Sequence, residues 1–272
     1  ANPSYRCWAE IDLGALRGNL AWIRSRIGTH ARLLAVVKAD AYGHGLPQIA
    51  TTLMQSGTDM FGVATLREAQ AVRAVGEGWP ILILGACLPA EMGAAIEQEM
   101  MVTVSSLAEA KAFDREARRQ KKIVVAHVKV DTGMGRLGFW HETALEPIGL
   151  MSQLRNLKLG GLWSHFASAG EDDSYTRMQF ASFQRVAAAL RERHLCPPML
   201  HMANSPALLF MPETILDLVR PGYLIYGIVP PKAASIARHL RPAMSFKSRI
   251  VFLKTIAAGN SISYGNTFTA LR

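Results

Sequence analysis

The chain has 272 residues, half of them apolar, and a formal net charge of +9. This composition predicts a globular protein with one large α/β domain and the start of a second. No apolar run approaches the roughly 20 residues of a membrane-spanning helix, so we expect no membrane partner. The basic residues are scattered, and no aromatic residues interleave with their densest cluster at 115–122, which reads as an exposed helix end. The charge therefore favours a solvated surface with an anion-binding site over nucleic-acid binding.

The three cysteines, Cys7, Cys87 and Cys196, are odd in number and far apart, and none belongs to a CxxC pair. This spacing argues against a disulfide framework and against a zinc site. Residues 1–12 lack the apolar stretch of a signal peptide. We therefore expect a cytoplasmic protein without a bound metal.

Short apolar runs recur along the chain with helical segments between them. The eight strand-like runs are 33–37, 61–64, 81–84, 101–104, 123–130, 159–166, 200–203 and 218–226, and the clearest helical segments are 64–75, 106–119 and 177–193. Alternating strands and helices imply a parallel sheet, and eight such units predict a (β/α)8 barrel. The main rival is a doubly wound open sheet, which usually has fewer strands; moreover, no GxGxxG motif follows the first run.

The pattern changes after about residue 230. Residues 243–263 alternate apolar and polar side chains, with no following helix and with a turn at Gly259 and Asn260. We expect an antiparallel β-domain there, with too few residues left to close it. The predicted fold class is thus α/β, with a (β/α)8 barrel at 13–230 followed by a C-terminal antiparallel β-domain, incomplete here, made of 1–12 and 231–272.

Polar residues follow or end five of the eight predicted strands, at the end where barrel enzymes carry their chemistry. They are Lys38 at the first strand, Lys129 and Asp131 at the fifth, His165 at the sixth, Asn204 and Ser205 at the seventh, and Arg220 and Gly222 in the eighth. Each alone has a structural explanation, because a lysine after a strand is usually solvated and a histidine there is usually hydrogen-bonded within the protein. Their coincidence at one rim favours an active site.

Lys38 directly follows the apolar run 33–37, so its amine is partly desolvated and suited to forming a Schiff base. Tyr42 offers a hydroxyl nearby, and Gly43 and Gly45 permit backbone to pass close to a ligand. These features favour a carbonyl ligand bound covalently at the first strand.

The ends of the seventh and eighth strands suggest what that ligand carries. Phosphate commonly binds there in barrels; Ser205 supplies a hydroxyl, and Gly222 lets backbone amides approach an anion. A Schiff-base lysine opposite a phosphate site implies pyridoxal phosphate (PLP). Spacing alone leaves open a barrel aldolase that binds a substrate phosphate instead.

Six blocks of sequence carry a family resemblance. They are AVVKADAYGHG, HVKVDTGMGRLGF, SHFASA, HMANSPA, RPGYLIYG and ISYGNTFTA, in that order. In these blocks the chain closely resembles alanine racemase, a fold type III PLP-dependent enzyme, over essentially its whole length. The resemblance implies an isomerase that interconverts L- and D-alanine as a homodimer with shared active sites. It also implies a role in supplying D-alanine for peptidoglycan of the bacterial cell wall.

The resemblance implies two catalytic bases. Lys38 would hold PLP and act as one base, and Tyr264 of the partner subunit would act as the other. Racemisation needs such a pair, because one base removes the α-proton from one face while the other delivers a proton to the opposite face. The alternative for Tyr264 is an ordinary strand tyrosine in the core.

The resemblance also implies the remaining site residues. Arg136 would bind the substrate carboxylate, and Lys129 matches a lysine that is often carbamylated in the family, with an unmodified buried lysine as the alternative. Arg220 would face the pyridine nitrogen and leave it unprotonated, because arginine does not readily release a proton. The other cofactor-binding residues would be Tyr42, His165, Asn204, Ser205, Gly222 and Tyr223.

The chain departs from the family pattern at its end, where a Cys-Met-Asp motif and a late phosphate-binding tyrosine are not found. One alternative is therefore a fragment that binds PLP but is inactive. A second is a racemase of broader amino-acid specificity. A third is a fold type III decarboxylase, which Arg220 disfavours.

Overall fold

The computed structural model describes residues 4–272, which form two units. The larger unit is Asp12–Ala243, and the smaller unit combines residues 4–11 with Met244–Arg272. The sequence-based domain boundaries stay a proposal, and their residues 1–3 lie outside the described part of the chain.

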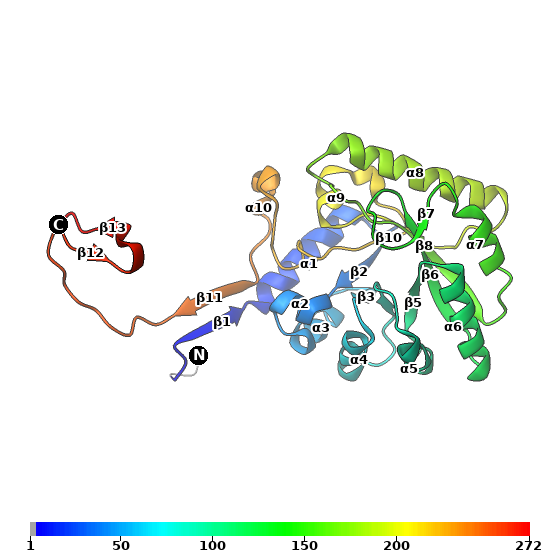
Figure 1. Cartoon of the computed structure of the whole chain (residues 1–272), viewed down its shortest axis with the longest axis horizontal. Helices are drawn as coiled ribbons and strands as arrows, with labels where there is room; N and C mark the ends of the chain where they lie inside the picture. The colour runs from blue at the N-terminus through cyan, green and yellow to red at the C-terminus, as the bar shows by residue number, and fades with distance from the viewer. Residues whose placement is uncertain (1–3) are drawn as a thin grey trace. The chain divides into compact units, whose positions relative to one another are not determined.

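The larger unit contains eight parallel strands that pair in one continuous path; Figure 1 shows them among the helices. They are β2 (Arg32–Val36), β3 (Met60–Val63), β4 (Ile81–Ile83), β5 (Met101–Val104), β6 (Val124–Asp131), β8 (Leu157–Trp163), β9 (Leu200–His201) and β10 (Leu218–Val219). They pair in the order β10-β2-β3-β4-β5-β6-β8-β9, and the short β7 (Phe139–Trp140) adds to β6. A parallel bridge between Asn204 and Arg220 links the segments after β9 and β10, so the barrel is nearly closed. The predicted (β/α)8 barrel is confirmed.

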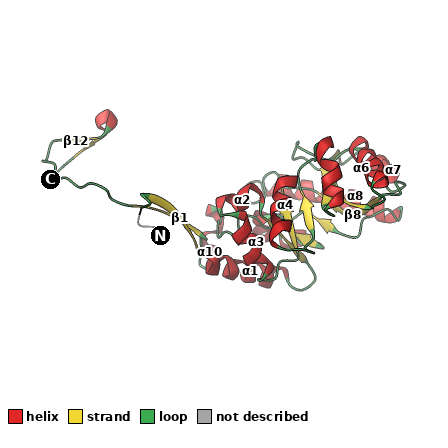
Figure 2. Cartoon of the chain, turned by 90° about the horizontal axis from the view of Figure 1, so that it is seen from below, coloured by secondary structure: helices red, strands yellow, loops and turns green. Residues whose placement is uncertain are grey.

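Helices connect the strands and lie outside them (Figure 2). They are α1 (Leu13–Ile27), α3 (Leu46–Met54), α4 (Leu66–Val75), α5 (Met92–Glu97), α6 (Leu107–Arg119), α7 (Leu145–Met151), α8 (Asp173–Glu192), α9 (Ser205–Phe210) and α10 (Ala234–Ala237). Side chains of Asp12, Thr65, Ser106, Asp172 and Asn204 accept a backbone N–H in the first turn of α1, α4, α6, α8 and α9. Such caps are why these helices begin where they do. None of the helices in residues 4–272 is long and apolar enough to cross a bilayer.

Most predicted elements differ from the observed ones by a few residues at one or both ends, and three of the differences have a clear local reason. Ile123 is 65% exposed and precedes β6 rather than belonging to it. The run 218–226 is a strand only in its first two residues, because Pro221 cannot donate to a ladder and the chain then turns, with the Tyr226 N–H bonded to the Tyr223 carbonyl. Helix α8 begins earlier than predicted, where Asp172 caps it.

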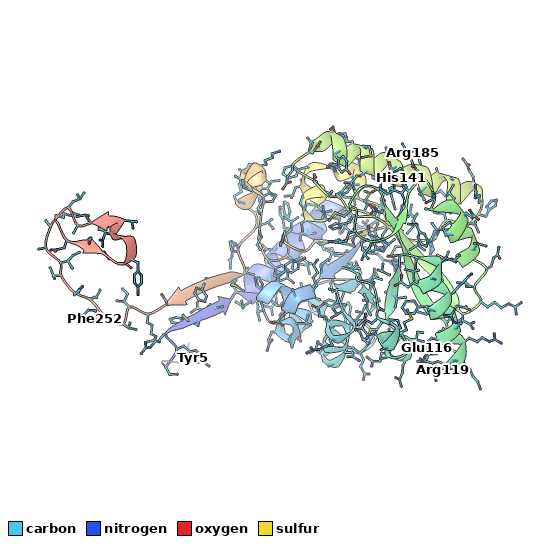
Figure 3. The ribbon with its side chains drawn as sticks, in the orientation of Figure 1. Tyr5, Glu116, Arg119, His141, Arg185 and Phe252 are labelled. Atoms are coloured by element: carbon cyan, nitrogen blue, oxygen red, sulfur yellow. The ribbon has the colours of Figure 1, made fainter. Side chains whose placement is uncertain are left out.

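The basic cluster at 115–122 occupies the last turns of α6 and the loop after it, as predicted for an exposed helix end. Within it Arg119 forms an exposed ion pair with Glu116, which Figure 3 labels. Basic side chains at a helix C-terminus interact favourably with the helix dipole. The cluster therefore has a local structural explanation.

The smaller unit is antiparallel, as predicted for the segment after the barrel. Strand β1 (Cys7–Ile11) pairs with β11 (Met244–Ser248), and β12 (Ser261–Ile262) pairs with β13 (Phe268–Thr269). Within the segment 243–263, which was predicted to begin an antiparallel β-domain, only Met244–Ser248 and Ser261–Ile262 are strands. Apolar side chains of this unit are largely exposed; Phe252, for example, is 76% exposed and is labelled in Figure 3.

The barrel interior of the larger unit has an apolar and a polar side. Leu34, Val36, Met60, Leu82 and Leu218 form a buried cluster at β2, β3, β4 and β10. On β6, β8 and β9, by contrast, buried polar side chains occupy neighbouring register positions. Lys129 pairs with Trp163, which pairs with His201, and such partners share one face of a sheet. This polar half supports the site described next.

Candidate active site

A cavity of about 460 Å³ lies at the carboxyl ends of the barrel strands. It brings together nine residues predicted from the sequence: Lys38, Tyr42, Arg136, His165, Asn204, Ser205, Arg220, Gly222 and Tyr223. The sequence-based prediction missed the rest of its wall, namely Val36, Ala64, Leu84, Gly85, Leu137, Trp163 and Pro206. None of these lining residues is a carboxylate, so the cavity suits an anionic ligand.

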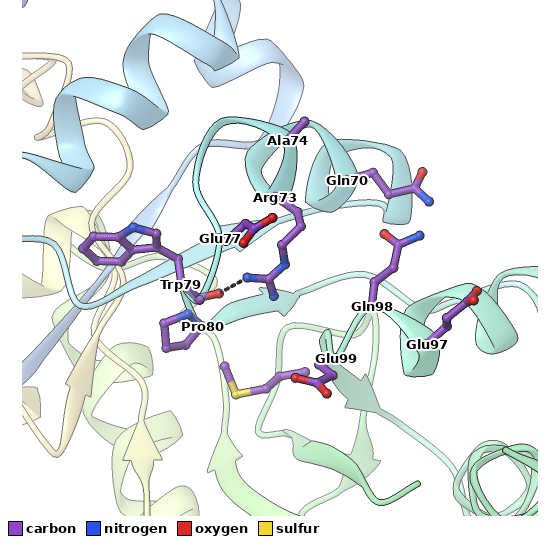
Figure 4. Close-up of a pocket in the computed structure, with 11 residues that line it drawn as sticks. Gln70, Arg73, Ala74, Glu77, Trp79, Pro80, Glu97, Gln98 and Glu99 are labelled. Atoms are coloured by element: carbon purple, nitrogen blue, oxygen red, sulfur yellow. Dashed lines mark hydrogen bonds between the residues drawn. The ribbon is translucent and has the colours of Figure 1, made fainter. Parts of the chain in front are cut away.

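A second hollow, of about 680 Å³, lies near the amino ends of β4 and β5 (Figure 4). Its wall includes Arg73, Glu77, Trp79 and Glu99, and Arg73 donates to the Trp79 carbonyl over 2.8 Å. It contains none of the predicted site residues. Because barrel enzymes carry their chemistry at the carboxyl ends of the strands, the smaller cavity is the candidate site.

Lys38 opens a left-handed turn, drawn as α2 (Lys38–Gly43) in Figure 1. Ala39, Asp40, Ala41 and Tyr42 have φ of 52, 53, 54 and 56°. A non-glycine residue in this region costs roughly 1–2 kcal/mol, so tertiary contacts must hold the turn. The Ala39 N–H donates to Glu68, and the Leu46 N–H donates to Asp40, each over 2.7 Å. This turn was not foreseen from the sequence, where four consecutive non-glycine residues gave no signal for it.

Tyr42 packs among aromatic rings at the end of that turn. Its ring lies 5.3 Å from Tyr223 and 5.1 Å from Tyr226 between centroids. Burial, with Tyr223 adding to it, raises the pKa of Tyr42 to about 12, so the phenol stays a neutral donor. Gly222 faces it closely, because a Cβ there would lie 2.6 Å from the Tyr42 hydroxyl. A glycine is therefore required beside this ring.

The segments after β9 and β10 are tied together. Ser205 Oγ accepts the N–H groups of Gly222 and Leu224 over 2.9 and 3.3 Å. The Asn204 carboxamide accepts the Ala207 N–H over 3.1 Å and so caps α9. This arrangement places a serine hydroxyl and the start of a helix at one edge of the cavity.

Arg220 is a fully buried cation at the base of the cavity. It donates to His201 Nδ1 over 2.9 Å, and to the carbonyls of Ser164 and Met202 over 2.7 and 3.1 Å. Its Nη2 also lies 3.5 Å from His165 Nδ1. Burial lowers the pKa of Arg220 to about 9, which still leaves the guanidinium protonated at neutral pH.

Two buried histidines extend this network, and the sequence did not single them out. His201 Nε2 lies 2.8 Å from His127 Nδ1. Because Arg220 must donate to His201 Nδ1, His201 carries its proton on Nε2 and donates it to His127. Gly161, the register partner of His127, leaves room for the ring, since a Cβ there would lie 2.4 Å from it. The network therefore orients Arg220 through side chains within the strands.

This histidine pair predicts a pH-dependent stability. Burial, and next the charge of Arg220, lower the pKa of His127 to about 4 and that of His201 well below its usual value. In the unfolded chain these two histidines take up protons near pH 6.5, but in the folded protein they do not. Their contribution to the free energy of unfolding is therefore fully present above pH 6.5 and is lost progressively as the pH falls towards 4. We expect a loss of up to about 1.4 kcal/mol per pH unit for each histidine. Urea unfolding across this range measures the slope, and an equal slope in His127→Asn would contradict the assignment.

Lys129 is buried beside Trp163. Its Nζ lies 4.5 Å from the indole ring centre and 3.4 Å from the Val130 carbonyl. Burial, and next the charge of Arg220, lower the pKa of Lys129 to about 7. Trp163 also stacks against Arg220 at 4.7 Å, and its Nε1 is buried with no partner among the described residues. At pH 7 about half of the Lys129 amine is therefore neutral, and it lies against an indole whose N–H has no partner among the described residues.

Asp131 organises the loop that carries Arg136. Its carboxylate accepts the N–H groups of Gly133, Met134 and Gly135 on one oxygen and of Arg136 on the other, over 2.8 to 3.2 Å. Burial raises the pKa of Asp131, but the four donors outweigh it and hold that pKa below its usual value. The backbone beside Arg136 is therefore anchored directly to the end of β6.

Tyr264 lies in the smaller unit, at the start of the one-turn 3-10 helix η4 (Tyr264–Asn266), and its side chain is 98% exposed. It is not among the residues that line the cavity. Among residues 4–272, no cluster of His, Cys, Asp and Glu is placed to hold a metal ion.

Fold and cavity together define a (β/α)8-barrel enzyme. The family model for the N-terminal domain of alanine racemase matches residues 11–230. The chain is 42% identical to alanine racemase of Desulforamulus reducens, over 96% of this chain and 72% of that protein. It is 37% identical to alanine racemase of Halothermothrix orenii, over 97% of this chain and 70% of that protein. The chain therefore belongs to the alanine racemase family, whose members are isomerases.

Solved structures agree with this assignment. Alanine racemase of Clostridium difficile 630 superposes with a TM-score of 0.89 at 34% identity, covering 98% of this chain and 71% of that one. Alanine racemase of Streptomyces lavendulae superposes with a TM-score of 0.91 at 34% identity, covering 99% of this chain and 72% of that one.

Proposed function

We propose that the protein interconverts L- and D-alanine with PLP bound at Lys38. The observation that carries the proposal is the convergence of Lys38, Arg136 and Arg220 on one cavity without a carboxylate. Membership of the alanine racemase family supports the alanine reaction. In a cell that builds peptidoglycan, the product would supply its D-alanine.

The cavity fits PLP in size and in charge. Its volume of about 460 Å³ is within the range of small-molecule sites. Cationic side chains suit the phosphate of PLP and the carboxylate of alanine. Lys38 would bind the carbonyl carbon, and Arg220 would face the pyridine nitrogen. The phosphate would be held by Tyr42, Ser205, Gly222 and Tyr223, with His165 and Asn204 completing the cofactor site.

In this proposal two residues move the protons. PLP, when bound, supplies the electron sink that acidifies the α-carbon of alanine. Lys38 takes or gives a proton on one face of that carbon, and Tyr264 of the partner subunit does so on the other. Arg136 binds the substrate carboxylate and orients the α-carbon between the two bases. The protein would act as a cytoplasmic homodimer with shared sites.

We propose further that Lys129 is carbamylated. The lowered pKa of about 7 leaves much of this amine neutral at physiological pH, and the neutral amine is the form that reacts with carbon dioxide. The product is an anion that removes the repulsion from Arg220. The Trp163 N–H, which has no partner among the described residues, is a donor available beside it.

The proposed function is tested with PLP, borohydride and alanine. Borohydride reduction of the protein after PLP addition should attach the cofactor to the peptide containing Lys38, and the same preparation should convert L- to D-alanine. No label on Lys38 contradicts the proposal. A label without conversion favours an inactive PLP-binding protein, and equal conversion of serine or basic amino acids favours a broad-specificity racemase.

Shared active sites predict complementation between two inactive variants. In mixed dimers of Lys38→Ala and Tyr264→Phe, one of the two sites keeps both bases. Free exchange makes half the dimers mixed, so activity should return to about a quarter of wild type. Chiral chromatography of alanine after mixing measures this, and no recovery despite exchange of subunits, followed by mass, would contradict the shared site.

Loss of the Asp131 carboxylate should weaken alanine binding. In Asp131→Asn only one oxygen remains for four N–H donors, so the loop no longer presents Arg136. We expect KM for alanine to rise about tenfold or more while PLP still labels Lys38. Asp172→Asn is the matched control, because Asp172 also accepts a backbone N–H but caps α8 away from the cavity. An equal rise of KM in both variants would contradict this role.

A further inference from the structure

The side chain of Glu68 accepts hydrogen bonds from the backbone of two neighbouring βα units. It is the third residue of α4 and completes a capping box with Thr65, whose hydroxyl accepts the Glu68 N–H over 3.3 Å. Its Oε2 accepts the N–H groups of Ala64 and Thr65 over 2.7 and 3.3 Å. Its Oε1 accepts the Ala39 N–H over 2.7 Å. One oxygen therefore serves the cap, and the other holds the residue that directly follows Lys38.

The left-handed conformation of this turn is held by hydrogen bonds to side chains at its two ends. Ala39 and Asp40 have φ of 52 and 53° and are both exposed, so packing of their side chains cannot hold that conformation. Asp40 closes the far end of the turn through the Leu46 N–H. Glu68 is the side chain that holds its near end, beside Lys38.

A similar cap occurs elsewhere in the barrel without this additional bond. In α6, Ser106 accepts the Glu109 N–H over 3.2 Å, and Glu109 accepts the Ser105 N–H over 2.8 Å. Within the described part of the chain, these Glu109 bonds stay in its own βα unit. Helix capping therefore does not account for the reach of Glu68 to Ala39.

We propose that Glu68 is a positioning residue for Lys38. By holding the Ala39 N–H, it keeps the left-handed turn closed and sets the direction in which the Lys38 amine enters the cavity. The same turn ends at Tyr42, so Glu68 also determines where that hydroxyl lies. The inference rests on the proposed function, in which Lys38 bonds to PLP and moves the substrate proton.

The first test uses the full chain without added PLP. In Glu68→Gln, amide hydrogen exchange at 39–46 should be about tenfold faster than in wild type, because one uncharged acceptor oxygen remains for three N–H donors. Glu109→Gln and Thr65→Ala should leave 39–46 protected, since they disturb only helix caps. Equal protection in Glu68→Gln and wild type, or equal exposure in Thr65→Ala and Glu68→Gln, would overturn the inference.

The second test uses the enzyme with PLP and alanine. In Glu68→Gln, kcat should fall about tenfold and the rate of borohydride labelling at Lys38 should change, while KM for alanine stays near wild type. Glu109→Gln should match wild type in all three. If Glu68→Gln also matches wild type, the inference fails and the proposed function stands. If wild type takes no label at Lys38, the proposed function fails, and hydrogen exchange still decides whether Glu68 holds the turn.

Discussion

Lys38→Ala is expected to lower the rate of L- to D-alanine conversion by about a thousandfold or more. The change removes both the amine that would bond to PLP and one of the two bases, and each contribution is large on its own. PLP should then bind only through noncovalent contacts, and borohydride should leave no label. Chiral chromatography of alanine and mass spectrometry of the peptide at residue 38 measure the two effects.

Two further variants separate the chemistry of Lys38 from its charge. Lys38→Arg keeps a cation at the cavity but offers no nucleophilic amine, so it should be as inactive as Lys38→Ala. Lys122→Ala removes a lysine that donates to the Glu97 carbonyl away from the cavity, and it should be fully active. Substantial activity in Lys38→Arg would show that the charge alone is needed, which would contradict the proposed role.

Arg220→Met is expected to lower the free energy of unfolding by about 3–5 kcal/mol, because each buried acceptor left unpaired costs roughly 1–3 kcal/mol. Methionine fills a similar volume, but it leaves three buried acceptors without their donor: His201 Nδ1 and the carbonyls of Ser164 and Met202. Unpaired buried acceptors carry their full desolvation cost. Urea unfolding of the full chain at pH 7.5, where the histidine pair is neutral, measures the loss.

Lys129→Met is the matched control for the loss of a buried basic side chain. Lys129 is as buried as Arg220, but its single hydrogen bond is a long one of 3.4 Å to the Val130 carbonyl. Replacing the unmodified lysine should therefore change the unfolding free energy by less than about 1 kcal/mol. Equal losses in the two variants would mean that removal of a buried basic side chain, rather than loss of the hydrogen bonds of Arg220, decides stability here.

The strands and most helix starts were predictable because they depend on local chemistry. Short apolar runs become buried strands, and capping side chains such as Thr65 and Ser106 begin helices. The eighth strand was predicted to be longer than it is, because the apolar residues continue past Pro221. Apolar character alone does not show that a chain turns. The rim residues were predictable for a related reason: the carboxyl ends of parallel strands meet in one place.

The parts that were missed depend on which residues become neighbours. His127, Trp163 and His201 lie within strands, and in the sequence they are indistinguishable from ordinary buried positions. They form a network only because β6, β8 and β9 are adjacent and in a given register. Glu68 likewise reads as a helix cap until the structure shows its second oxygen on Ala39.

By itself the sequence determined the barrel, its family and the residues at the rim, including Lys38, because local patterning and strand ends specify these. Only the tertiary structure decided how Lys38 is held. Four non-glycine residues adopt a left-handed turn whose cost exceeds what local preferences can offset. Contacts from α4 and from the tyrosines around Tyr42 hold it. Such contacts join segments that are distant in the chain, and no local pattern records them.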